Sequence, residues 1–234
     1  MCFSAEASFA GGVIISSIGI ATIKKIHNPS QIVFACIPLF FGIQQIVEGF
    51  LWLTLPNPEY LSIQRFSTYA FLIMADIIWP LMIPFSVLFM EENKKRKRIL
   101  WILLMIGLFT SIYYAYCLIS FNVNPQIMEY HVQYNSDFPK SLMIPAFIVY
   151  LITTISPLFV SSIKRTHLLG VLMFLSCLVT AIFFRQYLTS VWCFFAALIS
   201  GVIFWILRDS KIKFNFDYLA LLKDQLIKNK TINH

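Results

Sequence analysis

Charged side chains are scarce in this sequence: Asp, Glu, Lys and Arg make up 12% of its 234 residues, whereas 59% of the residues are hydrophobic. An average soluble domain has about 25% charged and about 45–50% apolar residues. The shortage of charge therefore excludes an ordinary soluble domain. A mean hydropathy of +0.76 instead indicates a polytopic membrane protein.

Cysteine and histidine are too few and too scattered for the common metal and redox motifs. The five cysteines contain no Cys-x-x-Cys pair, which excludes a zinc knuckle and a dithiol redox motif. The four histidines fall on both faces of the predicted bundle, so they cannot form a three-histidine zinc site. The sequence therefore predicts no metal and no other cofactor, and His131 is only a weak candidate for a metal ligand.

Other familiar reactive groups are missing as well. No serine lies in a nucleophile elbow, and the last predicted span has no lysine that could form a retinal Schiff base. Cys2, Cys117 and Cys193 fall toward the same predicted side of the membrane. One disulfide among these three cysteines and a set of buried free thiols are both open alternatives.

Long apolar runs are what the sequence does contain. A helix needs about 20 residues to cross a hydrocarbon core of about 30 Å, and seven segments meet or nearly meet that length. We therefore predict an all-α protein with one seven-helix transmembrane domain at residues 1–207 and no cleavable signal peptide. The predicted spans are residues 5–24, 31–55, 66–90, 99–121, 141–163, 168–184 and 188–207.

The basic residues decide the predicted orientation. All lysines and arginines except Arg65, Lys140 and Arg185 fall on one side of a seven-span arrangement. The positive-inside rule places that side in the cytoplasm, with the amino terminus outside and the carboxyl terminus inside the cell membrane. The basic run directly abuts a predicted span, so we assign it to contact with anionic inner-leaflet lipids rather than with nucleic acid. This run consists of Lys94, Lys95, Arg96, Lys97 and Arg98.

Polar side chains interrupt the second and third predicted spans. Because residues three or four apart share a helix face, Gln44, Gln45, Glu48 and Trp52 form one stripe. The third span places Asp76 about 15 Å below the outer boundary and the second places Glu48 about 10 Å below it, at 1.5 Å per residue. Both carboxylates are therefore predicted to face one outward-opening cavity between spans one, two, three and seven.

A carboxylate inside the bilayer costs about 2.5 kcal/mol or more, so it normally faces the bundle interior and pairs, hydrates, binds a cation or is protonated. The nearest candidate counter-charge is Arg185, at the outer end of span six. The alternative to a ligand site is a buried polar clasp, in which Glu48 or Asp76 accepts hydrogen bonds that only fix the helix packing.

Two segments lie outside the predicted spans. Residues 122–140 form the one outer loop long enough for a lid, although a disordered connector is the alternative. Residues 208–234 place Tyr218, Leu219, Leu222 and Leu226 at helical spacing. This pattern predicts an amphipathic cytoplasmic tail helix that lies on the inner leaflet or binds a partner.

Four stretches resemble one known family: MCFSAEASFAGG, FFGIQQIVEGFLWL, WPLMIPFSV and SVWCFFAALIS. The family is mainly bacterial, consists of multi-pass membrane proteins without an established activity, and opens with Met-Cys-Phe-Ser-Ala-x-Ala-Ser-Phe. The resemblance implies seven spans and a common site around Cys2, Ser4, Glu48 and Trp192. It implies no particular reaction.

The leading functional hypothesis is binding or transport of a small polar or cationic solute, or of protons. Glu48 and Asp76 would be the ionisable groups, and Gln44, Gln45 and Trp52 would orient the solute. The second hypothesis is a membrane-embedded, hydrolase-like enzyme acting on a lipid-like substrate, with a carboxylate as acid or base and His131 as ligand or proton shuttle. The third is a scaffold or sensor that acts through the tail helix.

Overall fold

The computed structural model describes residues 4–208. It contains seven helices that are long and apolar enough to cross a membrane, as the sequence predicts. The chain is therefore a multi-pass membrane protein. The seven candidate spans are Ala5–Ile23, Pro29–Thr54, Pro58–Met90, Lys94–Ser120, Lys140–Val160, Lys164–Phe183 and Arg185–Arg208. Cys2 and the predicted tail helix lie outside the described residues.

Four spans are single α-helices, and the other three include shorter elements. The single helices are α1 (Ala5–Ile23), α5 (Lys94–Ser120), α6 (Lys140–Val160) and α7 (Lys164–Phe183). The second span joins η1 (Pro29–Gln31) to α2 (Ile32–Thr54). The third joins η2 (Pro58–Tyr60), α3 (Leu61–Leu72), the π-helix η3 (Ile73–Ile78) and α4 (Trp79–Met90). The seventh joins η4 (Arg185–Tyr187), α8 (Leu188–Ser200) and α9 (Val202–Arg208).

Residues with short polar side chains cap the N-termini of several of these helices. The Ser4 side chain accepts a hydrogen bond from the Ala7 backbone N–H and caps α1. Asn28 and Asn57 cap η1 and η2, each followed directly by proline, and Asn93 caps α5. These side chains satisfy N–H groups that the first turn of a helix leaves without an intrahelical partner.

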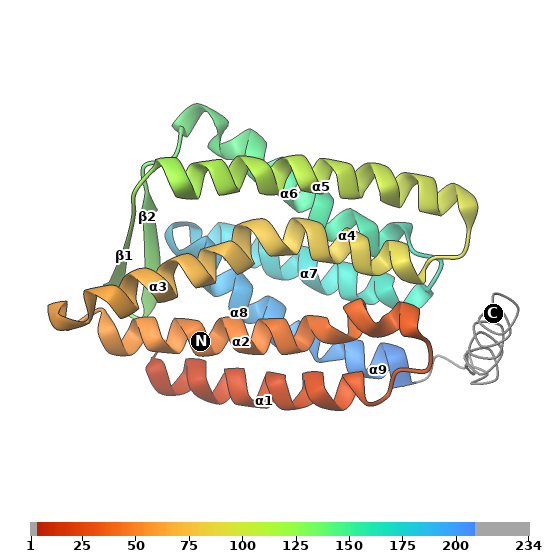
Figure 1. Cartoon of the computed structure of the whole chain (residues 1–234), viewed down its shortest axis with the longest axis horizontal. Coiled ribbons are helices and arrows are strands. Elements are labelled where there is room, and N and C mark those ends of the chain that lie inside the picture. Colours follow the sequence, from red (N-terminus) through yellow and green to blue (C-terminus); the bar gives the residue numbers. More distant parts are fainter. Residues whose placement is uncertain (1–3, 209–234) are drawn as a thin grey trace, which may run out of the picture.

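The spans run side by side and give the molecule two ends (Figure 1). The end with the connections after α1, α4 and α6 carries most of the basic residues, and we call it the basic end. Its basic residues are Lys24, Lys25, Lys94, Lys95, Arg96, Lys97, Arg98, Lys164, Arg165 and Arg208. The opposite end carries a β-hairpin, seen at the left of Figure 1, and we call it the hairpin end.

The hairpin is the one departure from an all-α fold within residues 4–208. Strands β1 (Val123–Met128) and β2 (His131–Ser136) pair antiparallel, with Met128 opposite His131. The segment is thus ordered as a hairpin rather than as a disordered connector. Sequence patterning missed it because β1 contains Pro125, and a proline within a run argues against a strand.

The α1–α2 pair packs closely through small residues. A Cβ atom on Gly19 would lie 2.5 Å from the Leu39 backbone nitrogen, and one on Gly12 would lie 2.9 Å from the Gly42 carbonyl oxygen. Such small residues let transmembrane helices approach through their backbones and gain dispersion contacts. The main core lies between these helices and the rest of the bundle, where the Phe41 and Trp79 rings stack at 3.8 Å.

At the basic end, Glu91 connects two loops. Its carboxylate accepts hydrogen bonds from the backbone N–H groups of Glu92, Asn93 and Ser162, the last at 2.6 Å. Burial alone would raise the pKa of Glu91, but these hydrogen bonds outweigh it and hold the pKa below the ordinary glutamate value. Arg96 strengthens the same connection by donating to the carbonyl oxygens of Val160 and Ser161.

Candidate functional site

The candidate site is a cavity of about 350 Å³ beneath the hairpin. It lies among η3, α5, α6 and α8, with the hairpin and η4 at its mouth. The spans around it therefore differ from the predicted set, because spans four and five take the places assigned to spans one and two. The lining consists of Leu72, Ala75, Asp76, Tyr114, Val123, Tyr134, Ser136, Phe138, Met143, Ile144, Phe147, Tyr150, Arg185, Gln186, Leu188, Thr189, Trp192 and Cys193.

Asp76 enters the cavity from the π-helix η3. A π-helix inserts an extra residue into a helix turn and leaves carbonyl groups without their usual α-helical partners, which is why π-helices are frequent at functional sites. Neighbouring helices supply hydrogen bonds here: the Tyr150 hydroxyl donates to the Ala75 carbonyl at 2.6 Å and the Ser111 hydroxyl donates to the Ile77 carbonyl at 2.7 Å. The carbonyls on both sides of Asp76 are thus fixed from α5 and α6.

Aromatic rings form much of the wall near Asp76. The Tyr114 and Tyr150 ring centroids are 6.1 Å apart, and those of Tyr150 and Trp192 are 5.9 Å apart, both with edge-to-face geometry. The Trp192 indole Nε1 is buried and has no hydrogen-bond acceptor within residues 4–208. Trp192, which the family resemblance implied as a site residue, therefore offers a buried donor beside the cavity.

Contacts between aromatic rings pack the hairpin against the helices at two places. The Tyr134 ring stacks on Phe71 at 5.0 Å, and the His131 ring lies 5.2 Å from Phe184 and 4.7 Å from Tyr187. Burial lowers the pKa of His131, so its neutral form is favoured in the folded protein. The weak metal candidate is thus packed among aromatic rings.

Glu48 is fully buried but does not line the cavity. The Tyr134 hydroxyl lies 3.5 Å from Glu48 Oε1, a long hydrogen bond. Since Tyr134 also lines the cavity, it connects Glu48 with the space that Asp76 enters. The two carboxylates are therefore neighbours across Tyr134 rather than two walls of one cavity.

Gln44 forms a buried clasp between three spans. Its Oε1 accepts a hydrogen bond from the Trp79 indole at 3.0 Å. Its Nε2 donates to the Phe71 carbonyl at 3.4 Å and lies 3.5 Å from the Cys193 sulfur. These contacts give Gln44 the structural role that we considered for the carboxylates.

Three further predicted site residues, Gln45, Trp52 and Ser4, do not line the cavity. Gln45 is fully buried, and neither of its amide atoms has a hydrogen-bond partner within the described chain. The Trp52 indole nitrogen is likewise buried without a hydrogen-bond partner within the described chain. Ser4 caps α1 instead of lining the cavity. Cys117 and Cys193 are both free thiols, so they do not form the disulfide that the sequence left open.

Several cavity residues were not singled out from the sequence as part of a site. Thr189 and Gln186 follow Arg185 closely in the chain, whereas Tyr114, Tyr150 and Ser136 are far from Asp76 in sequence. Arg185 was expected as a counter-charge, and it lines the same cavity as Asp76. A single tyrosine in an apolar span carries no pattern, so only the tertiary packing identifies these residues.

The chemistry of the site is that of a binding pocket with one acid and one base. Asp76 is the one acidic and Arg185 the one basic side chain among the residues that line the cavity. Within residues 4–208, no three His, Cys, Asp or Glu side chains come together as a metal site. The arrangement offers charge pairing, aromatic faces and hydroxyl groups to a small molecule.

The comparisons with known proteins assign the chain to a family but give it no activity. No curated protein and no solved structure matches the chain. A family of unknown function, DUF6629, matches residues 1–215, which includes every residue of the candidate site. The chain belongs to this family of unknown function, DUF6629.

Proposed function

We propose that the cavity beneath the hairpin binds a small organic cation, zwitterions included, and that the protein carries this solute across the membrane. The observation that carries the proposal is Asp76, the one acidic side chain on a cavity lined largely by apolar and aromatic groups. In low-dielectric surroundings a carboxylate is costly unless it is paired or protonated. A bound cation would offset that cost.

The aromatic wall favours an ammonium group over a metal ion. Tyr114, Tyr150 and Trp192 surround the cavity near Asp76. Aromatic faces attract organic cations within about 6 Å, and this attraction is the usual basis of quaternary ammonium recognition. Hard metal ions instead prefer several oxygen ligands, and one carboxylate supplies too few.

The volume of the cavity and the positive charge of Arg185 narrow the class of solute further. A cavity of about 350 Å³ lies at the lower end of small-molecule sites, which span about 300–1,000 Å³. Arg185 lines the same cavity and is exposed. A zwitterion could therefore place its ammonium at Asp76 and its carboxylate at Arg185, where guanidinium groups bind carboxylates well.

Glu48 is the group we propose for proton uptake. It is fully buried, and the Tyr134 hydroxyl between Glu48 and the cavity can relay a change in charge or hydrogen bonding. A proton on Glu48 would lower the cost of keeping this carboxyl group in the bilayer. Solute movement coupled to protons would follow from such a link.

The test uses choline and glycine betaine as probes, with detergent-purified protein and reconstituted vesicles. Asp76→Asn keeps the side-chain size but removes the charge, and we expect at least a tenfold loss of binding, or about 1.4 kcal/mol. Glu129→Gln removes a carboxylate from the exposed hairpin turn and serves as the control. Equal binding by wild type and Asp76→Asn would contradict a cation site at Asp76.

The remaining assignments are proposals about the membrane. We infer that residues 1–207 form one transmembrane domain and that residues 208–234 form a separate cytoplasmic tail helix. We place the protein in the cell membrane with the hairpin end outside and the basic end in the cytoplasm. The basic end, including Lys94–Arg98, would then meet the anionic leaflet.

A further inference from the structure

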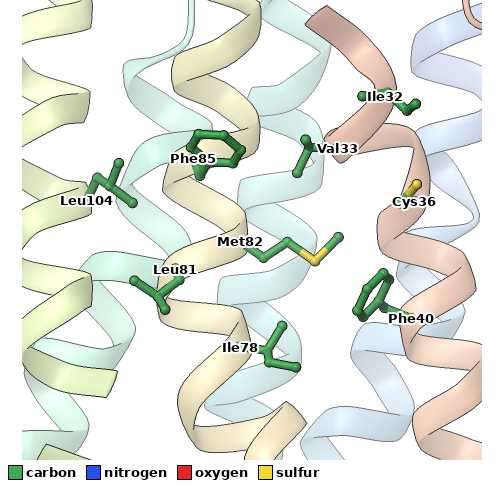
Figure 2. A pocket seen from close by; sticks show the side chains of 9 residues that line it. All are labelled: Ile32, Val33, Cys36, Phe40, Ile78, Leu81, Met82, Phe85 and Leu104. Carbon is green, nitrogen blue, oxygen red and sulfur yellow. The ribbon is translucent and has the colours of Figure 1, made fainter. Parts of the chain in front are cut away.

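A second, wholly apolar pocket lies on the membrane-spanning surface, far along the bundle from the hairpin. Figure 2 shows this groove between α2 and α4, with Leu104 of α5 on the far side of α4. Its volume is about 550 Å³, larger than the cavity at Asp76. The lining residues are Ile32, Val33, Cys36, Phe40, Ile78, Leu81, Met82, Phe85 and Leu104.

The groove is open and runs along the helices. Phe40 and Ile78 line one end of it, and Ile32, Val33 and Phe85 line the other (Figure 2). Phe40 lies eight residues after Ile32, so the two are about 12 Å apart along the helix at 1.5 Å per residue. One leaflet of the hydrocarbon core is about 15 Å thick, half of about 30 Å. The groove therefore matches one leaflet in length.

The lining chemistry selects an apolar occupant. No charged side chain and no amide or hydroxyl side chain lines the groove, and the sulfur atoms of Cys36 and Met82 are its weakly polar groups. The groove also lies within spans that cross the membrane. A hydrocarbon chain can enter such a groove from the bilayer without exposing any polar group, whereas a water-soluble ligand would leave its polar groups unpaired.

Positive charge lies at the end of the groove that meets the membrane surface. Lys97 is seven residues before Leu104, two helix turns along the same face of α5, or about 10 Å away. Lys24 and Lys25 lie in the connection between α1 and η1, and η1 packs against α4. Of the acidic residues there, Glu91 is committed to backbone N–H groups and Glu92 is exposed.

We propose that this groove holds one acyl chain of an anionic phospholipid, whose phosphate is bound at the basic end by Lys97 together with Lys24 and Lys25. The apolar lining of the groove favours an acyl chain, and the length of the groove matches one leaflet. The lysines favour a headgroup with negative charge. The inference is independent of the solute site, because the two pockets share no lining residue.

The first test measures binding of the lipid acyl chain by native mass spectrometry of the full-length protein. Phosphatidylglycerol and phosphatidylcholine with identical chains are added to the delipidated protein, and we expect one tightly retained phosphatidylglycerol. Met82→Trp fills the groove and should remove that retention. Met105→Trp makes the same change at an exposed α5 position outside the groove and should leave it unchanged.

The second test measures the headgroup contact. We expect Lys97→Glu to lower the preference for phosphatidylglycerol over phosphatidylcholine about tenfold, since each basic residue near an anionic surface contributes a factor of this order. Lys164→Glu changes the net charge equally at the same end, but on α7, and should keep the preference. An equal effect of both variants would overturn the specific phosphate contact and leave a diffuse charge effect.

Three results would overturn the groove as a lipid site. The first is that wild type and Met82→Trp retain both lipids equally, which would mean that only lipid of the surrounding bilayer is bound. The second is a protein dimer in place of the lipid adduct. The third is a Cys36 that the lipid does not protect. The third readout needs no variant: Cys36 is half-exposed in the groove, so phosphatidylglycerol should slow its alkylation by N-ethylmaleimide at least threefold. Phosphatidylcholine is the control lipid.

Discussion

At the scale of single residues, two adjacent glutamines on α2 have opposite surroundings. Both are fully buried. Gln44 accepts from the Trp79 indole and donates toward Phe71 and Cys193, whereas the Gln45 amide has no hydrogen-bond partner among residues 4–208. A buried amide stabilises a fold when it is bonded and destabilises it when it is not.

This contrast predicts opposite effects of the same substitution. Gln44→Leu should lower the free energy of unfolding by about 1–2 kcal/mol, since it leaves the Trp79 indole without its acceptor. Gln45→Leu should leave stability unchanged or raise it. Thermal unfolding of both variants in detergent checks this, and equal losses would show that Gln45 has a hydrogen-bond partner after all.

Glu91 predicts a dependence on pH at the basic end. Its pKa is held below the ordinary value of 4.5, so it binds a proton more readily in the unfolded chain than in the folded one. Its stabilising effect is therefore complete above about pH 4.5 and is lost as the pH falls through its folded pKa.

The measurement is thermal unfolding of wild type and Glu91→Gln from pH 7 to pH 3. The wild type should lose stability on acidification, and Glu91→Gln should be less stable at pH 7 and lose less below pH 4.5. Glu92→Gln, at an exposed neighbour, is the control and should follow the wild type. Parallel curves for wild type and Glu91→Gln would rule out this role for Glu91.

At the scale of elements, the distance between helices depends on which glycines face a neighbour. On α1, a Cβ on Gly19 would lie 2.5 Å from the Leu39 backbone nitrogen, whereas one on Gly11 would lie 3.7 Å from the Phe194 ring. The first distance requires two backbones to separate, and the second is an ordinary contact. The two positions therefore form a matched pair on one helix.

We expect Gly19→Ala to lower the free energy of unfolding by about 1–3 kcal/mol, the usual cost of overpacking. Gly11→Ala should be neutral or slightly stabilising, since alanine has the higher helix propensity. Thermal unfolding in the same detergent compares them. Similar melting temperatures would mean that α1 and α2 move apart without cost.

The third span shows that the placement of Asp76 depends on a break in the helix that the sequence of the span does not reveal. The sequence predicts one apolar span at residues 66–90, but η3 interrupts the α-helix at Ile73–Ile78, and Pro80 lies two residues beyond it. Hydrogen bonds from Ser111 and Tyr150 stabilise the carbonyls of this turn. Asp76 therefore depends on α5 and α6 for its placement.

At the scale of the whole molecule, the two pockets lie toward opposite ends of the bundle. The cavity with Asp76 lies at the hairpin end, and the apolar groove runs toward the basic end. This separation lets orientation in the membrane be tested independently of any ligand. The positive-inside rule predicts that the hairpin end faces outward.

Single cysteines placed at exposed Asn135 and Lys95 test that orientation in intact cells. A membrane-impermeant maleimide should label Asn135→Cys from outside and should label Lys95→Cys only after the cells are opened. The background protein without either change controls for the native thiols. The reverse labelling would invert the orientation and would place the solute cavity toward the cytoplasm.

The sequence by itself determined the seven spans, the segregation of basic residues and the presence of polar groups within α2 and the third span. These follow from hydropathy and helix periodicity, which act over one segment and need no partner. It also identified Asp76 and Arg185 as site candidates, because ionisable side chains in a membrane need an explanation, and the family resemblance implied Trp192.

Only the tertiary structure decided which polar groups meet. It joined Asp76 to Tyr114, Tyr150 and Arg185 around one cavity, separated Glu48 from that cavity by Tyr134, and made Gln44 a clasp. It also formed the hairpin and the apolar groove. These features depend on which helices lie side by side and on side chains that meet across distant segments, and a periodic pattern within one segment carries no information about its neighbours.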